Sequence, residues 1–286
     1  MLINEVCRDC QLKRNIDMYP AGSPPEVIEV YQSRVREILD RSDGISTPEV
    51  AEQMYDLRRE LFGADKDYSG IKSHFNSLML SLLPYMEQKV READDPLTMA
   101  VQYAMAGNYI DFGALSNVSE AVLQDQLDRA AEKAIDEDML ERFRKEILSA
   151  RRMVYFTDNC GEIVCDKLLI SVMRSLSPGL SVTVIVRSKQ AVNDATIEDA
   201  MQIGMEEAAD RVIGNGNGMP GNVIRAMSPE AMDAIEKADV LVSKGQGNYE
   251  GLCGCGLNIY YLFLCKCEAF MKRFGVSQFT GIMAHE

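Results

Sequence analysis

The sequence has little histidine, the side chain that most often moves protons in enzymes: 2 residues among 286. His74 lies in the helix-like stretch KSHFN, and His285 is next to the last residue. Neither has a neighbouring partner that indicates catalysis, so we interpret both as structural or solvated. The sequence therefore favours chemistry that does not depend on histidine.

Long apolar runs are also missing. No segment approaches the 18 or so consecutive apolar residues that predict a membrane-spanning helix. The N-terminal stretch MLINEVCRDCQLKRN lacks the apolar run of a secretory signal. We therefore expect a cytoplasmic location and no membrane partner. Low-complexity segments, long linkers and repeats are absent too, and no feature of the sequence indicates an oligomeric state.

Basic side chains are fewer than acidic ones, 30 against 44, which gives a formal net charge of -14. A surface this acidic repels nucleic-acid phosphates, so we expect no nucleic-acid partner. A small anionic substrate would be repelled at long range as well. If one binds, its site must supply local positive charge, from a metal ion or from lysine and arginine.

The hydrophobic content, 47% of the residues, is ample for one large domain or two smaller ones. Residues 1–150 are predicted to be helical: PPEVIEVYQSRVREILD has apolar residues at helical spacing, and STPEVAEQMYDLRRELFG begins with a Ser/Thr cap and stops at Gly63. The stretches SHFNSLMLSLLPYMEQKVREA, DPLTMAVQYAMAGNYIDF and SEAVLQDQLDRAAEKAIDEDMLERFRKEILSA continue in the same style.

The pattern changes after Arg152. The short apolar runs MVYFTDN, SVTVIVRS, RVIGNG and ADVLVSKG alternate with helical stretches. Such alternation predicts a parallel sheet that is covered on both faces. We therefore predict an α/β fold: a Rossmann-like, mostly parallel sheet flanked by helices in residues 151–286, with the all-helical region of residues 1–150 packed against it.

Polar residues follow the predicted strands, and ligands of open parallel sheets bind beyond the carboxyl ends of the strands. Asp158 and Asn159 follow the first strand, and Asn193 and Asp194 follow the second. Asp158, Asn159 and Asp194 would form an all-oxygen ligand set that suits Mg²⁺ or Mn²⁺. Asn193, in the same loop, is a candidate for contact with the substrate.

Three further residues complete a candidate phosphate site. A helix that opens near Gly161 would direct free N–H groups at an anion. Lys244, after the last of these strands, could neutralise a phosphate oxygen, and Glu162 could accept a proton from an attacking water. A metal ion, a cation and a carboxylate base are together sufficient to hydrolyse a phosphate ester.

Each of these stretches also has an ordinary interpretation. Asp, Asn, Cys and Gly together are a common turn composition, and an Asp-Asn pair after a strand is more often a turn or helix cap than a metal site. The glycine-rich stretch 214–221 is a weak match to a nucleotide-binding loop, because Pro220 and Gly221 interrupt it. We expect it to be a flexible loop that lines the pocket.

The eight cysteines include three close pairs, and at this length and in a reducing compartment they favour free thiols or a metal site over disulfides. Cys7 and Cys10 could bind zinc or a similar metal together with two thiols of the C-terminal pairs. The alternative is buried free thiols, because YYLFLCKCEAF is strongly apolar. The full set is Cys7/Cys10, Cys253/Cys255, Cys265/Cys267, Cys160 and Cys165.

Four motifs, AGNYIDFG, TDNCGEIVCDK, VRSKQAVNDAT and ADVLVSKGQGNYEGL, occur in an order and spacing that resemble the metal-dependent damage-control phosphatases, long known as domain of unknown function eighty-nine. The resemblance runs from about residue 5 to the C-terminus. The N-terminal C-x₂-C and the segment NIYYLFLCKC resemble the prokaryotic branch of that family.

The resemblance implies a helical region packed on a Rossmann-like sheet and one divalent cation, Mn²⁺, Mg²⁺, Co²⁺ or Ni²⁺. It implies that Asp158, Asn159 and Asp194 bind the cation and that Lys244 lies near the substrate phosphate. Asn108 and Asp111 would bring the helical region to the substrate. Cys160 departs from the family, in which alanine is usual at this position, and the glycine-rich loop is richer in glycine than expected.

The function predicted from these features is the metal-dependent hydrolysis of small phosphate esters, such as sugar phosphates or damaged phosphometabolites, by a metal-activated water. A carboxyl methyltransferase that uses S-adenosylmethionine is an alternative, although the glycine-rich loop follows a later strand than that function favours. A second alternative is a non-catalytic thiolate-metal or redox protein built on the cysteine pairs.

Overall fold

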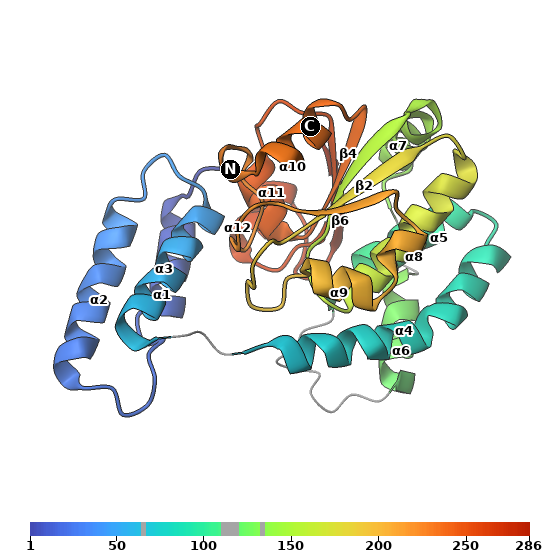
Figure 1. Ribbon diagram of the computed structural model, residues 1–286. Helices are drawn as coiled ribbons and strands as arrows, with labels where there is room; N and C mark the ends of the chain where they lie inside the picture. The colour runs from blue at the N-terminus through green and yellow to red at the C-terminus, as the bar shows by residue number, and fades with distance from the viewer. Residues whose placement is uncertain (64–66, 110–119, 132–134) are drawn as a thin grey trace.

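In the part of the chain that the computed structural model describes, residues 1–63, 67–109, 120–131 and 135–286, a six-stranded sheet forms the centre (Figure 1). The strand order is β3-β2-β1-β4-β5-β6. Neighbouring strands are parallel except β5 and β6, which are antiparallel. The strands are β1 (Arg152–Phe156), β2 (Ser181–Val186), β3 (Arg211–Gly214), β4 (Val240–Lys244), β5 (Ile259–Leu264) and β6 (Gly281–His285).

This sheet confirms the predicted α/β class with a mostly parallel sheet, and it adds two strands. The sequence pattern predicts neither the strand β5, which forms from a continuous apolar segment, nor the strand β6. β5 is buried along its whole length, whereas β6, at the sheet edge, is only partly covered. The strand order places β1 and β4 side by side, although β2 and β3 lie between them in the sequence.

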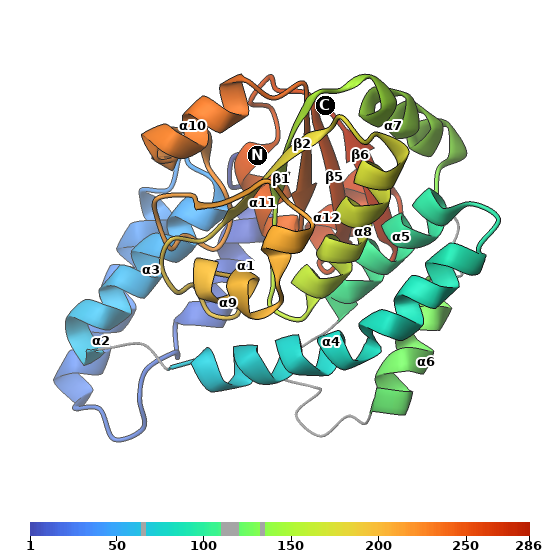
Figure 2. The same cartoon turned by 45° about the vertical axis from the view of Figure 1, so that its right-hand side comes forward.

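Helices cover both faces of the sheet (Figure 2). On one face, Met153 and Tyr155 of β1 share an apolar core with α4, α5, α7 and α8. On the other face, Val154 and Phe156 share a core with α10, α11 and α12. Alternate side chains of each strand therefore point to opposite faces of the sheet and pack into two separate cores. The bounds are α4 (Ser69–Glu92), α5 (Pro96–Ala106), α6 (Glu120–Ala131), α7 (Glu137–Ser149), α8 (Glu162–Leu176), α9 (Ile197–Gln202), α10 (Pro229–Glu236), α11 (Gln246–Leu252) and α12 (Glu268–Phe274).

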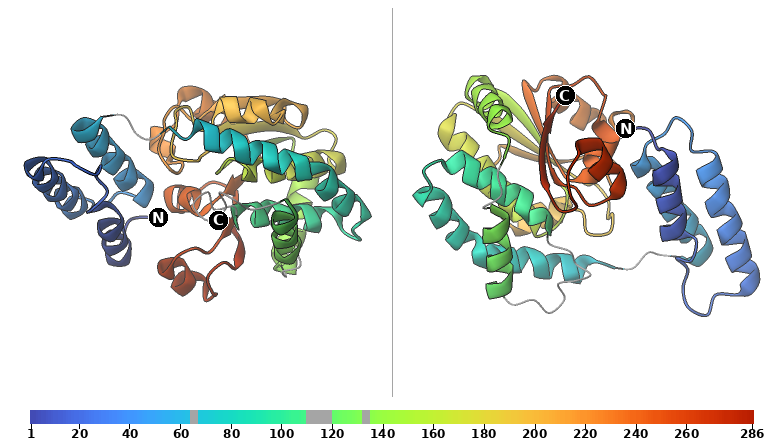
Figure 3. Two further views of the ribbon diagram at one scale, coloured as in Figure 1. Left: turned by 90° about the horizontal axis from the view of Figure 1, so that it is seen from below. Right: turned by 180° about the vertical axis from the view of Figure 1, so that it is seen from behind.

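The first three helices form a lobe of their own, which we call the N-terminal lobe: α1 (Glu5–Asn15), α2 (Pro25–Asp40) and α3 (Thr47–Phe62). Figure 3 shows this lobe beside the α/β part, on the side of α11 and α12. It has a separate apolar core that includes Tyr31, Val35 and Leu57. The helical half of the sequence is thus divided, because α4, α5 and α7 pack on the sheet and α1–α3 pack on one another.

Among the described residues, no helix is both long enough and apolar enough to cross a membrane. The stretches predicted to be helical form helices within these residues, and the last of them contains both α6 and α7.

The core of the N-terminal lobe yields a stability prediction. Leu57, 2% exposed, and Leu148, 53% exposed, are both leucines inside helices. We expect Leu57→Ala to lower the free energy of unfolding by about 2–5 kcal/mol, because it removes buried methyl groups and leaves a cavity. Leu148→Ala is the matched control and should cost less than about 0.5 kcal/mol. Urea unfolding followed by circular dichroism measures both, and equal effects would contradict a separate core around α3.

Candidate active site

The loops after β1 and β2 meet at the carboxyl ends of these strands. Asn159 and Asp194 pair across an isolated antiparallel bridge. The Ala195 N–H donates to the Asp158 carbonyl at 2.8 Å, and the Cys160 N–H donates to the Asn193 carbonyl at 2.9 Å. The structure therefore brings Asp158, Asn159 and Asp194 into one site, and Asn193 contributes its backbone to hold the two loops together.

The Asp158 carboxylate is enclosed by neighbours from three parts of the chain. Its Oδ2 accepts hydrogen bonds from Asn159 Nδ2 at 2.7 Å and from Asn108 Nδ2 at 3.1 Å. Gly245, the residue after β4, comes so close that an added Cβ would lie 2.0 Å from Oδ2. Asn108 follows α5, so the helical half does reach the site. Asp111 lies outside the described residues.

Glu162 and Lys244 form a buried ion pair beside Asp158. Lys244 Nζ donates to Glu162 Oε1, to Asp166 Oδ1 and to the Ala104 carbonyl, each at 2.7 Å. All three ammonium protons are thus directed at protein acceptors, and both partners of the pair are fully buried. The roles of Lys244 toward a phosphate oxygen and of Glu162 as a proton acceptor stay predictions.

Glu162 also orients two amides. Its Oε2 accepts from Asn108 Nδ2 at 2.6 Å and from Asn159 Nδ2 at 3.0 Å. Both amide nitrogens donate in addition to Asp158, so the two donors of each amide group are used. Asn108 Oδ1 is buried and has no hydrogen-bond partner within the described part of the chain. Glu162 thereby leaves the carbonyl oxygens of Asn108 and Asn159 as the groups available to a ligand.

Asp194 is held from the other side by an arginine that directly follows β2. Arg187 Nε donates to Asp194 Oδ2 at 2.7 Å, and Arg187 Nη2 donates to Asn248 Oδ1 at 2.9 Å. The arginine is 2% exposed, so its charge acts in a poorly solvated environment. Asn248 in turn donates to the carbonyls of Thr157 and Lys244, which join the ends of β1 and β4.

Helix α8 opens at the site, as predicted, with Gly161 at φ +76° as the residue before its first turn. The Gly161 N–H donates to Asn76 Oδ1 of α4 at 2.7 Å. This amide is therefore already satisfied by the protein, and phosphate binding at Gly161 stays a prediction. Cys160, beside it, is buried in the apolar core, and burial raises the pKa of its thiol well above the usual value.

The carboxylates of the site affect one another. Burial, with the charges of Glu162 and Asp194, raises the pKa of Asp158 to about 8. Burial also raises the pKa of Asp194, and Arg187 offsets only part of that effect. For Glu162, the penalty of burial is outweighed by Lys244, and the pKa is lowered. The protein thus keeps Glu162 ionised at the expense of its neighbour Asp158.

The residues present fit a hard divalent cation. The site holds more carboxylates than cations, with a difference of two charges when all are ionised: Asp158, Glu162, Asp166 and Asp194 against Lys244 and Arg187, all of them buried except the partly exposed Asp158. Oxygens are the ligands that Mg²⁺ and Mn²⁺ prefer. Within the described residues no three His, Cys, Asp or Glu side chains are arranged to hold a metal, so a cation at this point would take Asp158 and Asp194 together with an amide oxygen such as that of Asn159.

The structure adds residues that the sequence did not indicate. Lys266, in the loop after β5, is exposed, and its charge is among those that oppose the burial-driven rise in the pKa of Asp158. Its backbone N–H donates to Gln246 Oε1 at 3.1 Å, and its ammonium group has no hydrogen bond or ion pair in the described residues. Lys266 follows the carboxyl end of β5, the position at which ligands of parallel sheets bind. A sequence signal for Lys266 would therefore require the prediction of β5 as a strand.

The glycine-rich loop after β3 is held by asparagine contacts. Asn215 Nδ2 donates to Asn222 Oδ1 at 3.0 Å, and Asn222 Nδ2 donates to Asn248 Oδ1 at 3.0 Å. Only the short 3₁₀ turn Ile224–Ala226 follows the loop, so it lacks the helix N-terminus that a dinucleotide-binding loop needs. Of the loop residues, Pro220 lines a cavity that also includes residues of α1 and α3, and the expected role of the loop at the substrate pocket stays a prediction.

Comparison with known proteins identifies relatives. A family model for the damage-control phosphatase ARMT1-like domain matches residues 3–281. A damage-control phosphatase of Archaeoglobus fulgidus is 34% identical over 220 residues, which cover 76% of this chain and 75% of that protein. A damage-control phosphatase of Pyrococcus horikoshii is 32% identical over 179 residues, 62% of this chain and 61% of that protein.

The fold also has a solved counterpart. The crystal structure of a DUF89 family protein from Pyrococcus horikoshii matches with a TM-score of 0.84 and covers 100% of this chain and 99% of that chain. Its sequence identity over this match is 24%, so the likeness establishes the shared fold alone.

The close approach of Gly245 to Asp158 can be tested with a matched pair of glycines. Gly245 (φ +81°) and Gly254 (φ +82°) both adopt a conformation that disfavours side chains, but only Gly245 faces a neighbour within 4 Å. We expect Gly254→Ala to cost about 1–2 kcal/mol of stability from backbone strain. Gly245→Ala should cost more, because it also displaces the Asp158 carboxylate. Urea unfolding compares them, and equal losses would contradict the packing of Gly245 on Asp158.

Proposed function

The chain belongs to the damage-control phosphatase ARMT1-like domain family, and on this premise we propose that it is a metal-dependent phosphatase that hydrolyses small phosphate esters. The observation that carries the proposal is the convergence of Asp158, Asn159 and Asp194 at the carboxyl ends of β1 and β2, in a site whose carboxylates outnumber its cations by two. The names of the archaeal relatives support a phosphorylated metabolite as the substrate, with sugar phosphates and damaged phosphometabolites as the proposed classes.

We assign the binding of one divalent cation, Mn²⁺, Mg²⁺, Co²⁺ or Ni²⁺, to the oxygens of Asp158, Asn159 and Asp194. Such a cation supplies polarisation of a phosphoryl oxygen and lowers the pKa of bound water. Asn159 presents its carbonyl oxygen because Asp158 and Glu162 take both of its N–H groups. Arg187 fixes one oxygen of Asp194 and so determines which oxygen remains for the cation.

The two lysines have different proposed roles. Lys266 is exposed beyond β5 and is the cation best placed to meet an incoming phosphate. Lys244 is fully buried and acts through Glu162, which orients Asn108 and Asn159. We therefore treat Lys244 and Glu162 as positioning residues. The lowered pKa of Glu162 makes it a weak proton acceptor, which also favours this role.

The alternative of a carboxyl methyltransferase has no comparable support. Its main sequence feature, the glycine-rich loop, is occupied with asparagine contacts that lead to Asn248 and so to Arg187. Through Asn248 and Arg187, the loop thus helps to hold Asp194 in the proposed phosphatase site.

The proposed site predicts that Asp158→Ala abolishes phosphatase activity. With p-nitrophenyl phosphate or a sugar phosphate and added Mn²⁺, we expect kcat/KM to fall roughly a hundredfold or more, since a metal ion contributes several kcal/mol of transition-state stabilisation. Chelation of the wild-type protein should have the same effect and should be reversed by added cation. Asp233→Ala, an exposed change on α10, is the control and should keep full activity. Full activity of Asp158→Ala would refute the site assignment.

The lysine roles can be separated by Lys244→Met and Lys266→Met. Lys244→Met leaves Glu162 and Asp166 as unpaired buried carboxylates, so we expect it to lower the free energy of unfolding by about 3–5 kcal/mol. Lys266→Met should change stability by less than about 0.5 kcal/mol. It should instead raise KM for the phosphate ester. Unfolding curves and steady-state kinetics give both readouts, with the exposed Lys272→Met on α12 as control; an unchanged KM in Lys266→Met would rule out its role.

A further inference from the structure

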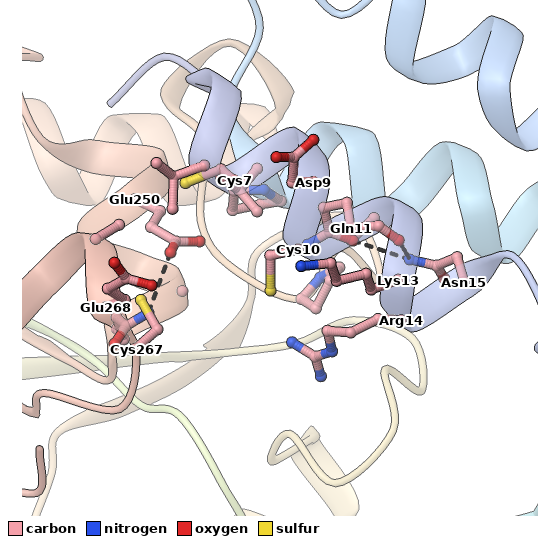
Figure 4. A pocket seen from close by; sticks show the side chains of 18 of the residues that line it. Cys7, Asp9, Cys10, Gln11, Lys13, Arg14, Asn15, Glu250, Cys267 and Glu268 are labelled. Atoms are coloured by element: carbon pink, nitrogen blue, oxygen red, sulfur yellow. Dashed lines mark hydrogen bonds between the residues drawn. The ribbon is translucent and has the colours of Figure 1, made fainter.

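A cavity of about 680 Å³ lies between the N-terminal lobe and the start of α11 and α12. Figure 4 shows that three thiols line it, from segments at opposite ends of the sequence. Cys7 and Cys10 belong to α1, and Cys267 is the residue before α12. The carboxylate of Glu250, on α11, lies among them. The proposed phosphatase mechanism uses none of these four side chains.

We propose that Cys7, Cys10, Cys267 and Glu250 bind a second metal ion, Zn²⁺, in this cavity. Three thiolates and one carboxylate are a ligand set that suits tetrahedral Zn²⁺. The set differs in kind from the oxygen ligands of the phosphatase site, which favour harder cations. The two sites would therefore select different metals by ligand chemistry.

The spacing of Cys7 and Cys10 on α1 favours a metal over a disulfide. Residues three apart on a helix lie on one face, with Cβ atoms about 5–6 Å apart. A disulfide needs Cβ atoms about 3.5–4.5 Å apart, closer than this helical spacing. Two thiolates that share a Zn²⁺ ion at about 2.3 Å from each sulfur can keep the helical spacing.

Gln246 links the other two members of the set. Its Nε2 donates to Glu250 Oε1 at 3.2 Å and to Cys267 Sγ at 3.4 Å. One amide group therefore reaches both side chains and keeps them near each other. Hydrogen-bond donors of this kind behind metal ligands orient the ligands and support metal affinity.

The environment of Cys7 connects α1 with this pair. Burial, the Glu250 carboxylate and, to a smaller extent, Cys267 raise the pKa of the Cys7 thiol, so the three groups share one electrostatic environment. Glu250 is 8% exposed; its carboxylate accepts a hydrogen bond from the neutral Gln246 amide and is also subject to the charges of the N-terminal ammonium group and Arg14. A bound cation would add to these charges.

Binding requires a local adjustment. In the described residues no three of these side chains yet surround one point. Cys10 is exposed and Cys267 half-buried, so rotation about their Cα–Cβ bonds can direct both sulfurs into the cavity. The ion would then fix α1, and with it the N-terminal lobe, against the helix that begins two residues after Lys244.

The test uses the reduced, metal-free full-length protein and Co²⁺ as a spectroscopic substitute for Zn²⁺. We expect an ultraviolet thiolate-to-cobalt charge-transfer band whose amplitude corresponds to one thiolate-bound Co²⁺ per chain and that is removed by added Zn²⁺. In Cys7→Ser/Cys10→Ser, the affinity for the Co²⁺ that gives this band should fall at least about a hundredfold. Cys253→Ser/Cys255→Ser is the matched control, because these two cysteines do not line the cavity, and it should keep the band.

Two further variants make the result decisive. Glu250→Gln keeps the size of the side chain and should weaken Co²⁺ binding without loss of the folded circular dichroism spectrum, which protects the test if a serine variant misfolds. Asp158→Ala should keep the thiolate band although it loses phosphatase activity, so the two proposals fail separately. Absence of the band in the reduced wild-type protein, or its persistence in Cys7→Ser/Cys10→Ser, would overturn the second metal site.

Discussion

The catalytic end of the sheet depends on the buried ammonium group of Lys244. This one group joins three elements. Lys244 is the last residue of β4, and its ammonium group donates hydrogen bonds to Glu162 and Asp166 of α8 and to the Ala104 carbonyl in the last turn of α5. Asn108 lies four residues after Ala104, so the hydrogen bond between Lys244 and the Ala104 carbonyl also helps to position Asn108 against Asp158. Removing the lysine would leave two fully buried carboxylates without a cationic partner, an arrangement that proteins rarely tolerate.

A surplus of negative charge is the second constraint, and it has a functional meaning. Lys244 and Arg187 compensate part of the buried acidic cluster, and the raised pKa of Asp158 records the part that remains. A protein that required only stability would be better served by fewer carboxylates at this point. A divalent cation would remove the conflict and would attract the phosphate that the acidic chain otherwise repels. The repulsion within the acidic cluster would therefore be a source of affinity for such a cation.

Sequence reasoning predicted the residues whose position follows from topology and missed those whose position follows from tertiary contacts. Asp158, Asn159 and Asp194 meet because parallel strands end at one edge, a rule that can be applied without a structure. Arg187 directly follows β2, but its buried link to Asn248 depends on a helix 61 residues later, which no local pattern contains. Lys266 was missed because β5 is a single apolar run, and periodicity does not distinguish such a strand from another buried segment.

Helix α11, only 7 residues long, connects the two proposed sites. Asn248 on this helix binds Arg187 and, through it, positions Asp194. Two residues later, Glu250 faces the cavity of the thiols, and Gln246 at the start of the helix binds Glu250 and Cys267. A shift of α11 toward the N-terminal lobe would therefore move Asn248 as well. The side chains of both proposed sites thus share one short helix, so a displacement of α11 at one site would displace side chains of the other.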